Sequence, residues 1–149
     1  MTAPGALDPA IEQRVRASIG RQTLLTTLGV SVLALQPGRA ELGLRRRADL
    51  CQQHGFVHAG ALTALVDSAC GYAALTLFPP DRDVLTVDFS VSLVAPAAQE
   101  TFVAVGSVLR SGRTLTTCRG EVLGVTADGT RKLVALMQAT MMAVSTMSD

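Results

Sequence analysis

A carboxylate, Asp67, lies in the middle of an otherwise apolar stretch, GALTALVDSACGYAAL. Aspartate is rarely buried without a partner, because a bare carboxylate loses its hydration when it leaves water. Three roles suit such a residue: a structural one, capping backbone groups or pairing with an arginine; a metal ligand; or a catalytic acid, base or nucleophile. We favour the catalytic role, since carboxylates with perturbed environments gather at functional sites.

The two histidines, His54 and His58, lie close to this stretch. Their four-residue spacing would suit two metal ligands on one helix face, but no third ligand has a convincing spacing. We therefore expect no metal. A hydrogen bond to loop backbone is the simpler role for His54, whereas His58, at the expected start of a helix, is placed either for such a bond or for a ligand contact. Both histidines are candidates for substrate binding.

The residues His58-Ala59-Gly60 stand where a long helix is expected to begin. Backbone N–H groups at a helix start have no partner inside the helix, and with the helix dipole they can polarise a carbonyl or hold an oxyanion. The same residues also suit an ordinary helix start. From Ala59 to Asp67 is roughly 12 Å along the axis, too far for both to reach one carbonyl within one chain. If both act, a second copy supplies one of them, which predicts an isologous dimer with two shared sites.

The helix that would carry these residues is expected over 57–77, because this segment is rich in Ala and Leu and ends before Pro79-Pro80. It is apolar nearly all round and about long enough to span a bilayer. However, a carboxylate at mid-membrane is costly, so a helix buried inside a soluble protein is the better interpretation.

Shorter elements are expected on either side of this helix. An amphipathic helix over 8–19 begins with Asp8 as N-cap and Pro9 at its first position, and Gly20 marks its end. Patterns rich in Val, Leu and Thr predict strands over 28–35, 40–44, 84–93, 101–109, 115–126 and 132–144, the last four as a meander. A six-stranded antiparallel sheet wrapped around the long helix would bury both, giving an α+β fold. We expect one domain, 1–149, in which 1–24 form the N-terminal helix and lead-in.

The composition excludes several classes of partner. The 149 residues carry a net charge of +1, which gives no electrostatic case for nucleic acid. The one basic run, Arg45-Arg46-Arg47, suits a solvated strand end better than a phosphate contact. Three cysteines without zinc or CxxC spacing indicate neither a disulfide framework nor a metal site. The N-terminus has no signal-peptide pattern, so the expected location is the cytoplasm.

The segment QQHGFVHAGALTALVDSACGYAAL resembles the signature of the hotdog-fold acyl-CoA thioesterase superfamily. It is most similar to the branch typified by phenylacetate-pathway and small acyl-CoA thioesterases. That signature is a His-Gly-Gly-like helix start, followed by an acidic residue seven positions after the last glycine. Here His58-Ala59-Gly60 and Asp67 match this spacing, and Ala59 stands where the family often has glycine. The resemblance implies a hotdog fold over about residues 25 to 144 and hydrolysis of acyl-CoA thioesters.

The resemblance also implies further site residues. The family often has Asn six residues before the motif histidine, where this chain has Gln52, and a small hydroxyl residue on the strand after the helix, where it has Thr86. The turn Arg110-Ser111-Gly112-Arg113 resembles a loop that lies near the coenzyme A tail in relatives, and its charge suits phosphates. Tyr72, Leu75 and Phe89 are candidates for the pocket lining, although core packing is the simpler role for each.

These residues combine into one hypothesis. The N–H of Ala59 or Gly60 polarises the thioester carbonyl, and Asp67 of the other chain activates water or attacks directly. Thr86 orients Asp67 or the water, and Gln52 and His58 position the thioester. No cofactor is needed beyond the coenzyme A of the substrate, and we expect a homodimer or a homotetramer made of two dimers. Two alternatives stay open: an acyl-CoA-binding module without hydrolysis, and an enoyl-CoA hydratase or dehydratase on the same fold. The sequence leaves the acyl group undetermined.

Overall fold

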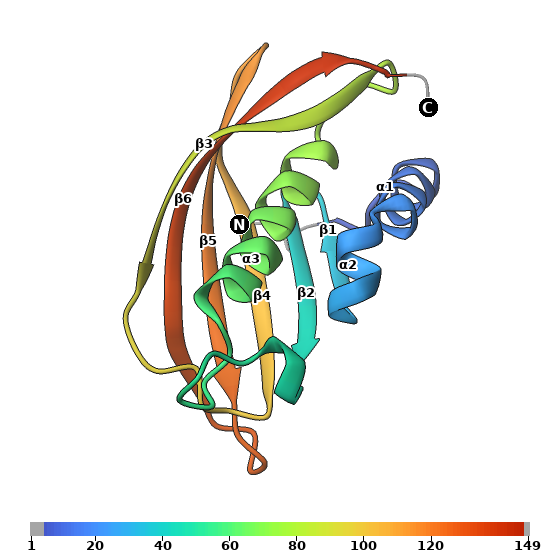
Figure 1. Ribbon diagram of the computed structural model, residues 1–149. Helices are drawn as coiled ribbons and strands as arrows, with labels where there is room; N and C mark the ends of the chain where they lie inside the picture. Colours follow the sequence, from blue (N-terminus) through green and yellow to red (C-terminus); the bar gives the residue numbers. More distant parts are fainter. Residues whose placement is uncertain (1–4, 148–149) are drawn as a thin grey trace.

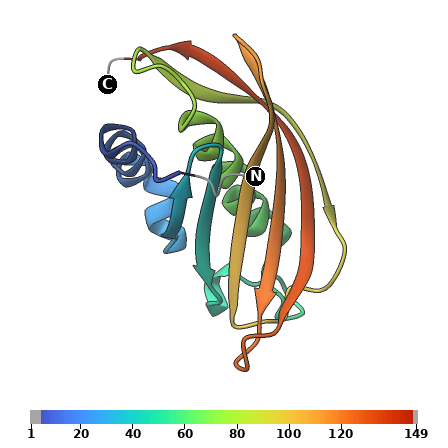
Figure 2. The same cartoon turned by 180° about the vertical axis from the view of Figure 1, so that it is seen from behind.

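A long helix, α3, crosses the concave face of a curved antiparallel sheet (Figure 1). The computed structural model describes residues 5–147. Seen from behind, the opposite face of the sheet carries no helix from the part of the chain that the structure describes (Figure 2). Six strands lie in the order β1-β2-β4-β5-β6-β3. Their bounds are β1 Ser31–Gln36, β2 Arg39–Arg45, β3 Arg82–Leu93, β4 Thr101–Ser111, β5 Leu115–Val125 and β6 Arg131–Ser145. The predicted six-stranded antiparallel sheet around one helix is confirmed.

The predicted meander of the last four strands is wrong in one respect. β3 pairs with β6, and β4 pairs with β2 and β5, so β3 and β4 are not neighbours. The connecting segment 94–100 is too long for a tight hairpin turn and instead crosses beneath the start of α3, where the Val57 N–H donates to the Ala97 carbonyl at 3.0 Å. This crossing places β3 at the far edge of the sheet, on the other side of α3 from β1 and β2.

The N-terminal region holds one helix more than predicted. Helix α1 spans Pro9–Arg21, and its N-cap is Asp8, whose side chain accepts from Ala10 N–H at 2.8 Å. A second helix, α2, spans Thr23–Leu28, where the sequence had suggested that a strand begins at Leu28. Leu25 and Leu28 are buried at helical spacing, and Gly29 ends α2 with a φ of 75°. A short 3₁₀ helix, Ala48–Leu50, was also not predicted.

Helix α3 spans Ala59–Leu75, slightly inside its predicted range, and Ser68 to Leu75 are all buried. Close approach to the sheet is possible because Gly106 of β4 and Gly120 of β5 pair with each other beneath it. A Cβ atom on Gly106 would overlap the Ala69 carbonyl, and one on Gly120 would overlap Val66 and Cys70. The two glycines therefore set the height of α3 above the sheet, and with it the position of Asp67.

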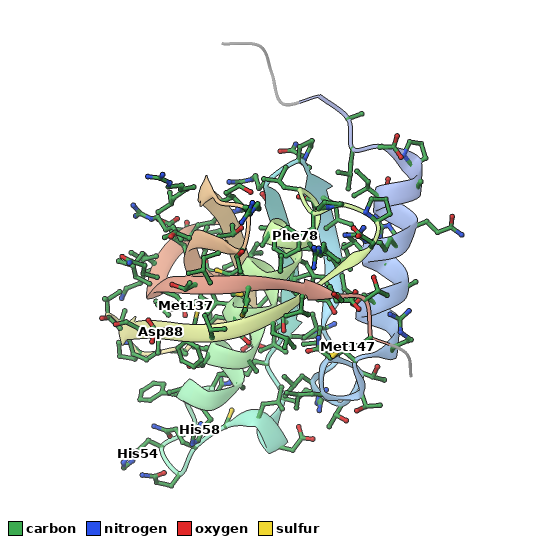
Figure 3. All side chains as sticks on the ribbon, turned by 90° about the horizontal axis from the view of Figure 1, so that it is seen from above. His54, His58, Phe78, Asp88, Met137 and Met147 are labelled. Carbon is green, nitrogen blue, oxygen red and sulfur yellow. The ribbon has the colours of Figure 1, made fainter. Side chains whose placement is uncertain are left out.

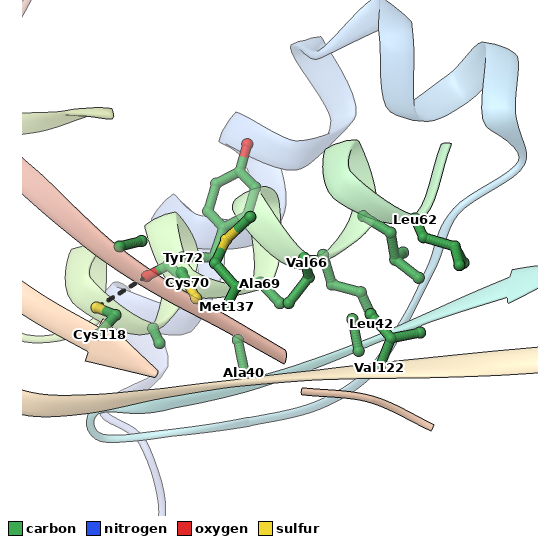
Figure 4. Close-up of a cluster of buried hydrophobic side chains, with 14 of the residues drawn as sticks. Ala40, Leu42, Leu62, Val66, Ala69, Cys70, Tyr72, Cys118, Val122 and Met137 are labelled. Carbon is green, nitrogen blue, oxygen red and sulfur yellow. Dashed lines mark hydrogen bonds between the residues drawn. The ribbon is translucent and has the colours of Figure 1, made fainter. Parts of the chain in front are cut away.

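The core lies between α3 and the sheet (Figure 4). Val66 and Ala69 of the helix are buried with Leu42, Val122 and Met137 of the strands. Arg14 of α1 reaches the C-terminal end of α3 and donates to the carbonyls of Leu75 and Phe78, where its positive charge suits the negative end of the helix dipole. Within residues 5–147, no helix is long and apolar enough to cross a membrane.

Candidate active site

Asp67 lies half-buried on α3 and faces β3. The Thr86 hydroxyl donates to Asp67 Oδ1 at 2.8 Å. Burial raises the pKa of the Asp67 carboxyl, and the hydrogen bond from Thr86 partly offsets this by favouring the charged form. Asp67 forms no ion pair within the described residues, which argues against the arginine-pairing alternative. Asp67 also lines a pocket of about 150 Å³.

The strand that supplies Thr86 is at the edge of the sheet. β3 pairs only with β6 in the described chain, and its register shifts between Thr86 and Asp88. The apolar side chains of Val87 and Phe89 are 50% and 43% exposed. Phe89 is therefore not a core residue, contrary to the role favoured from the sequence. An edge strand with bare apolar side chains and unpaired backbone groups is suited to pairing with another strand.

Most backbone N–H groups at the start of α3 donate to its N-cap residue. His58 is the N-cap: its Nδ1 accepts from the Gly60 N–H at 2.7 Å, and its carbonyl accepts from the Ala61 N–H at 3.0 Å. The Ala59 N–H has no acceptor among residues 5–147, and Ala59 is exposed. Of the two donors predicted for a substrate carbonyl, the structure engages Gly60 internally and leaves Ala59 available.

The loop before α3 is held together by Gln52. The Gln52 side-chain carbonyl accepts from the His54 N–H, and its backbone N–H donates to the Phe56 carbonyl at 2.8 Å. The amide nitrogen of its side chain remains for other partners. His54 and His58 lie at the same end of the molecule, on the chain that leads into α3 (Figure 3). The His54 side chain is exposed and makes no hydrogen bond to the described residues, so the backbone contact expected for it is not seen.

A groove of about 610 Å³ runs beside the start of α3, between the Gln52 loop and the segment that follows β3. Ala59 and Leu62 of the helix form part of its wall, together with Phe56. The remaining lining residues are Gln52, Gln53, Val57, His58, Leu93, Val94, Ala95, Pro96 and Ala97. The groove is mixed in polarity and opens next to the available Ala59 N–H.

The basic residues considered in the sequence fall into two groups: the run expected to be a solvated strand end and the turn expected near phosphates. Arg45 is exposed at the end of β2, as expected of a solvated strand end, whereas the Arg46 and Arg47 side chains donate to the carbonyls of Gly55 and Leu28. The β4–β5 turn containing Arg110, Ser111, Gly112 and Arg113 is exposed. It lies at the opposite end of the sheet from the start of α3 (Figure 1). Within one chain, the structure thus brings together Asp67 and Thr86, and separately Gln52, His58 and Ala59, but not the arginine turn.

Two residues near Asp67 were missed from the sequence. Ser18 of α1 and Gln22, which joins α1 to α2, line the same pocket as the carboxylate. Tyr72, named only as a core or pocket candidate, lies there too, whereas Leu75 is buried in the core. The sequence did not predict the helix over 23–28, and without this helix Gln22 cannot be placed against α3. Among the residues described, no cluster of three or more His, Cys, Asp or Glu side chains could hold a metal.

Comparison with known proteins gives consistent matches. The family model of the thioesterase superfamily matches residues 54–126. A protein named as a candidate esterase in Saccharolobus solfataricus is 30% identical over 88 residues, which cover 59% of this chain and 62% of that protein. A second candidate esterase, from Halobacterium salinarum, is 31% identical over 106 residues, which cover 68% of this chain and 70% of that protein.

Solved structures match over nearly the whole chain. A thioesterase family protein from Silicibacter pomeroyi has a TM-score of 0.88 and 42% identity, and the match covers 91% of this chain and 99% of that one. The PaaI protein of the E. coli phenylacetic acid degradation operon has a TM-score of 0.83 and 20% identity, with 96% and 100% covered. At that identity the second match speaks for the fold alone. The predicted hotdog fold is confirmed.

Proposed function

Because this chain belongs to the thioesterase superfamily, we propose that it hydrolyses acyl-CoA thioesters to a free acid and coenzyme A. The observation that carries the proposal is Asp67: a half-buried carboxylate that opens to a pocket, has no ion pair in the described chain and is held by one hydroxyl. A carboxylate with a raised pKa is a stronger base than one in water, which suits removal of a proton from water.

Two routes are open to Asp67 in this chemistry. As general base, it takes a proton from water while the water oxygen attacks the thioester carbonyl carbon, and the C–S bond then breaks to release the coenzyme A thiolate. As nucleophile, it attacks the carbon itself and expels the thiolate, and water then hydrolyses the resulting anhydride. Thiolate is a good leaving group, so neither route requires a strong general acid. Turnover is expected without an added metal or cofactor.

The developing oxyanion requires a donor, and the Ala59 N–H is the available one at the start of α3. It cannot serve the carboxylate of its own chain, because eight helical residues separate them by roughly 12 Å. We therefore propose that Asp67 of one subunit works with Ala59 of the other, in two sites related by a two-fold axis. The bare edge of β3, with exposed Val87 and Phe89, supports the partnership. Association of two dimers into a tetramer stays a prediction.

The rest of the substrate is assigned to the features around the helix start. We propose that the groove beside Ala59 holds the pantetheine arm and that Gln52 and His58 position the thioester, His58 through the ring nitrogen that does not cap the helix. Arg110 and Arg113 are proposed for the phosphates. Because they lie far from the helix start of their own chain, this role depends on the dimer as well.

The decisive experiment is release of free thiol from a panel of acyl-CoAs with short, medium and aromatic acyl groups. Steady turnover with at least one thioester supports the proposal. Binding of acyl-CoA without turnover would instead indicate a binding module, and addition of water to an enoyl-CoA would indicate a hydratase. Light scattering on the same sample tests the dimer, since a monomer with full activity contradicts the shared site.

A further inference from the structure

A small polar pocket adjoins the Asp67 carboxylate on the side away from the start of α3. Its volume is about 150 Å³, and Asp67 and Thr86 form one wall. The rest of the lining is Ser18, Gln22, Ser68, Gly71, Tyr72 and Val84. A group attached to a carbonyl carbon beside Asp67 can therefore extend into this pocket. Because the pocket is assigned to the acyl part of the same thioester, the inference rests on the proposed function.

The pocket is lined by hydrogen-bonding side chains from α1, from α3 and from Gln22, which lies between α1 and α2. Gln22 Nε2 donates to the Tyr72 hydroxyl oxygen at 3.0 Å, and Gln22 Oε1 accepts from the Ser68 hydroxyl at 3.3 Å. Ser18 Oγ lies 3.3 Å from the same Tyr72 oxygen. The Tyr72 side chain is only 3% exposed, and its hydroxyl points out of the apolar cluster toward the N-terminal helices (Figure 4). These hydrogen bonds hold the polar side chains of the pocket in place without a ligand.

This network has hydrogen-bonding capacity left over. A glutamine amide carries two N–H donors and a serine hydroxyl is both donor and acceptor. The bonds within residues 5–147 use one N–H of Gln22 and one contact of Ser18. The second N–H of Gln22 and the remaining positions on Ser18 have no partner among the described side chains. A ligand hydroxyl or carbonyl in the pocket can therefore be bonded without breaking the network.

Size and polarity together restrict the occupant. An enclosed cavity of about 150 Å³ accommodates a molecule the size of benzene, so the volume of this pocket matches a compact acyl group better than a long fatty chain. A purely apolar group of the right size would displace water from Gln22 and Ser18 without replacing its hydrogen bonds, which is unfavourable. We infer that the pocket selects a compact acyl group that carries a hydroxyl or a similar polar substituent, and that Tyr72, Gln22 and Ser18 determine this specificity.

The competing explanation is purely structural: the same network would merely fasten α1 and α2 to α3. If the network is purely structural, substitutions in it should lower stability and slow the hydrolysis of every thioester alike. If the network determines specificity, the same substitutions should change the ratio of kcat/KM between matched substrates. The experiment compares kcat/KM for butyryl-CoA against 3-hydroxybutyryl-CoA and for benzoyl-CoA against 3-hydroxybenzoyl-CoA. Dissociation constants for the non-hydrolysable thioether analogues of the same pairs give a second readout that does not require turnover.

In the wild type, the hydroxylated member of at least one pair is expected to be favoured about tenfold, and Tyr72→Phe and Gln22→Met are each expected to reduce that preference about fivefold. Ser107→Ala, which removes a hydroxyl bonded to Arg39 on the sheet, is the control and should leave the ratio unchanged. Turnover without a preference in either pair, or a preference that both variants retain, overturns the inference alone. A preference in analogue binding without turnover supports the pocket and overturns the proposed hydrolysis.

Discussion

Helix α3 carries two regions that differ in how far one chain completes them. Around Asp67, the carboxylate, its hydroxyl donor Thr86 and an adjoining pocket all come from the same subunit. At the helix start, most backbone donors bond to His58, and among residues 5–147 only the Ala59 N–H is left without an acceptor. The first region is half-buried and the second is exposed. One chain therefore carries both a carboxylate that can act as base and an N–H that can donate to an oxyanion, but the length of α3 separates the two groups.

Because the two regions differ in burial, they should respond differently to pH. Withdrawal from water raises the pKa of the Asp67 carboxyl and makes it sensitive to each neighbouring hydrogen bond. The exposed helix start instead offers a fixed backbone dipole that no pH change removes. We expect substitutions around Asp67 to alter the pH dependence of turnover, and substitutions at the helix start to alter its magnitude alone.

The largest effect is expected from Asp67→Asn. The amide keeps an acceptor for the Thr86 hydroxyl but cannot act as base, so kcat should fall by about 10²–10⁴. Because the folded-state pKa lies above its ordinary value, the ionised carboxylate costs stability at neutral pH. The variant should be at least as stable as the wild type at pH 7, and this advantage should shrink as the pH falls through that pKa. Thiol release and thermal unfolding measure the two effects, and retained activity refutes the role of Asp67.

Ala59→Pro tests the other region with little disturbance of the helix. Proline is well tolerated at the first helical position, and the preceding residue, His58, has a φ of −61° and a ψ of 138°, which suit a residue before proline. The substitution removes one N–H, and kcat should fall by about 10²–10³, the usual effect of one oxyanion donor. Ala59→Gly, which keeps the N–H, is the control. Equal activity of the two variants would show that this donor is not used.

Mixing the two inactive variants tests whether the regions meet across a dimer. In a dimer of one Asp67→Asn chain and one Ala59→Pro chain, one shared site carries both substitutions and the other carries neither. Random reassociation after unfolding makes half the dimers mixed, so about a quarter of wild-type activity should return. If both residues acted within one chain, mixing would restore nothing.

The part of this arrangement that follows from local chemistry could be predicted from the sequence. The start of α3, the position of Asp67 and most strand bounds depend on apolar pattern, glycine and proline. The place of β3 beside β6 could not be predicted, because strand pairing over long separations leaves no local signal. Helix α2 was missed because Leu28 also suits the Val- and Leu-rich strand that follows, and Gln22 was missed with it. Ser18 lies in a helix that was predicted, but the packing of that helix against α3 leaves no local signal in the sequence. The internal use of the Gly60 N–H depends on the orientation of the His58 ring, which spacing does not reveal.

A smaller effect is expected from Thr86→Val, because Thr86 acts through Asp67 as a positioning residue. Loss of the hydrogen bond removes an influence that lowers the carboxyl pKa, so that pKa should rise further. Activity requires the carboxylate, so kcat/KM falls as pH drops through this pKa. In the variant, the acid limb of the kcat/KM profile should therefore move to higher pH, and kcat/KM on that limb should be about tenfold below that of the wild type. Thr86→Ser keeps the hydroxyl and should restore the profile. A uniform loss at every pH would indicate a merely structural role.

The smallest effect is expected at His58, where capping and substrate contact can be separated. His58→Ala removes the acceptor for the Gly60 N–H and should lower stability by about 1 kcal/mol, the usual cost of an N-cap loss. His58→Asn replaces the acceptor and should recover that stability. It has no second ring nitrogen, however, so KM should rise in both variants if His58 also positions the thioester. A wild-type KM in the Asn variant would confine His58 to the cap. The helix start would then contribute to catalysis through the Ala59 N–H and the groove beside it.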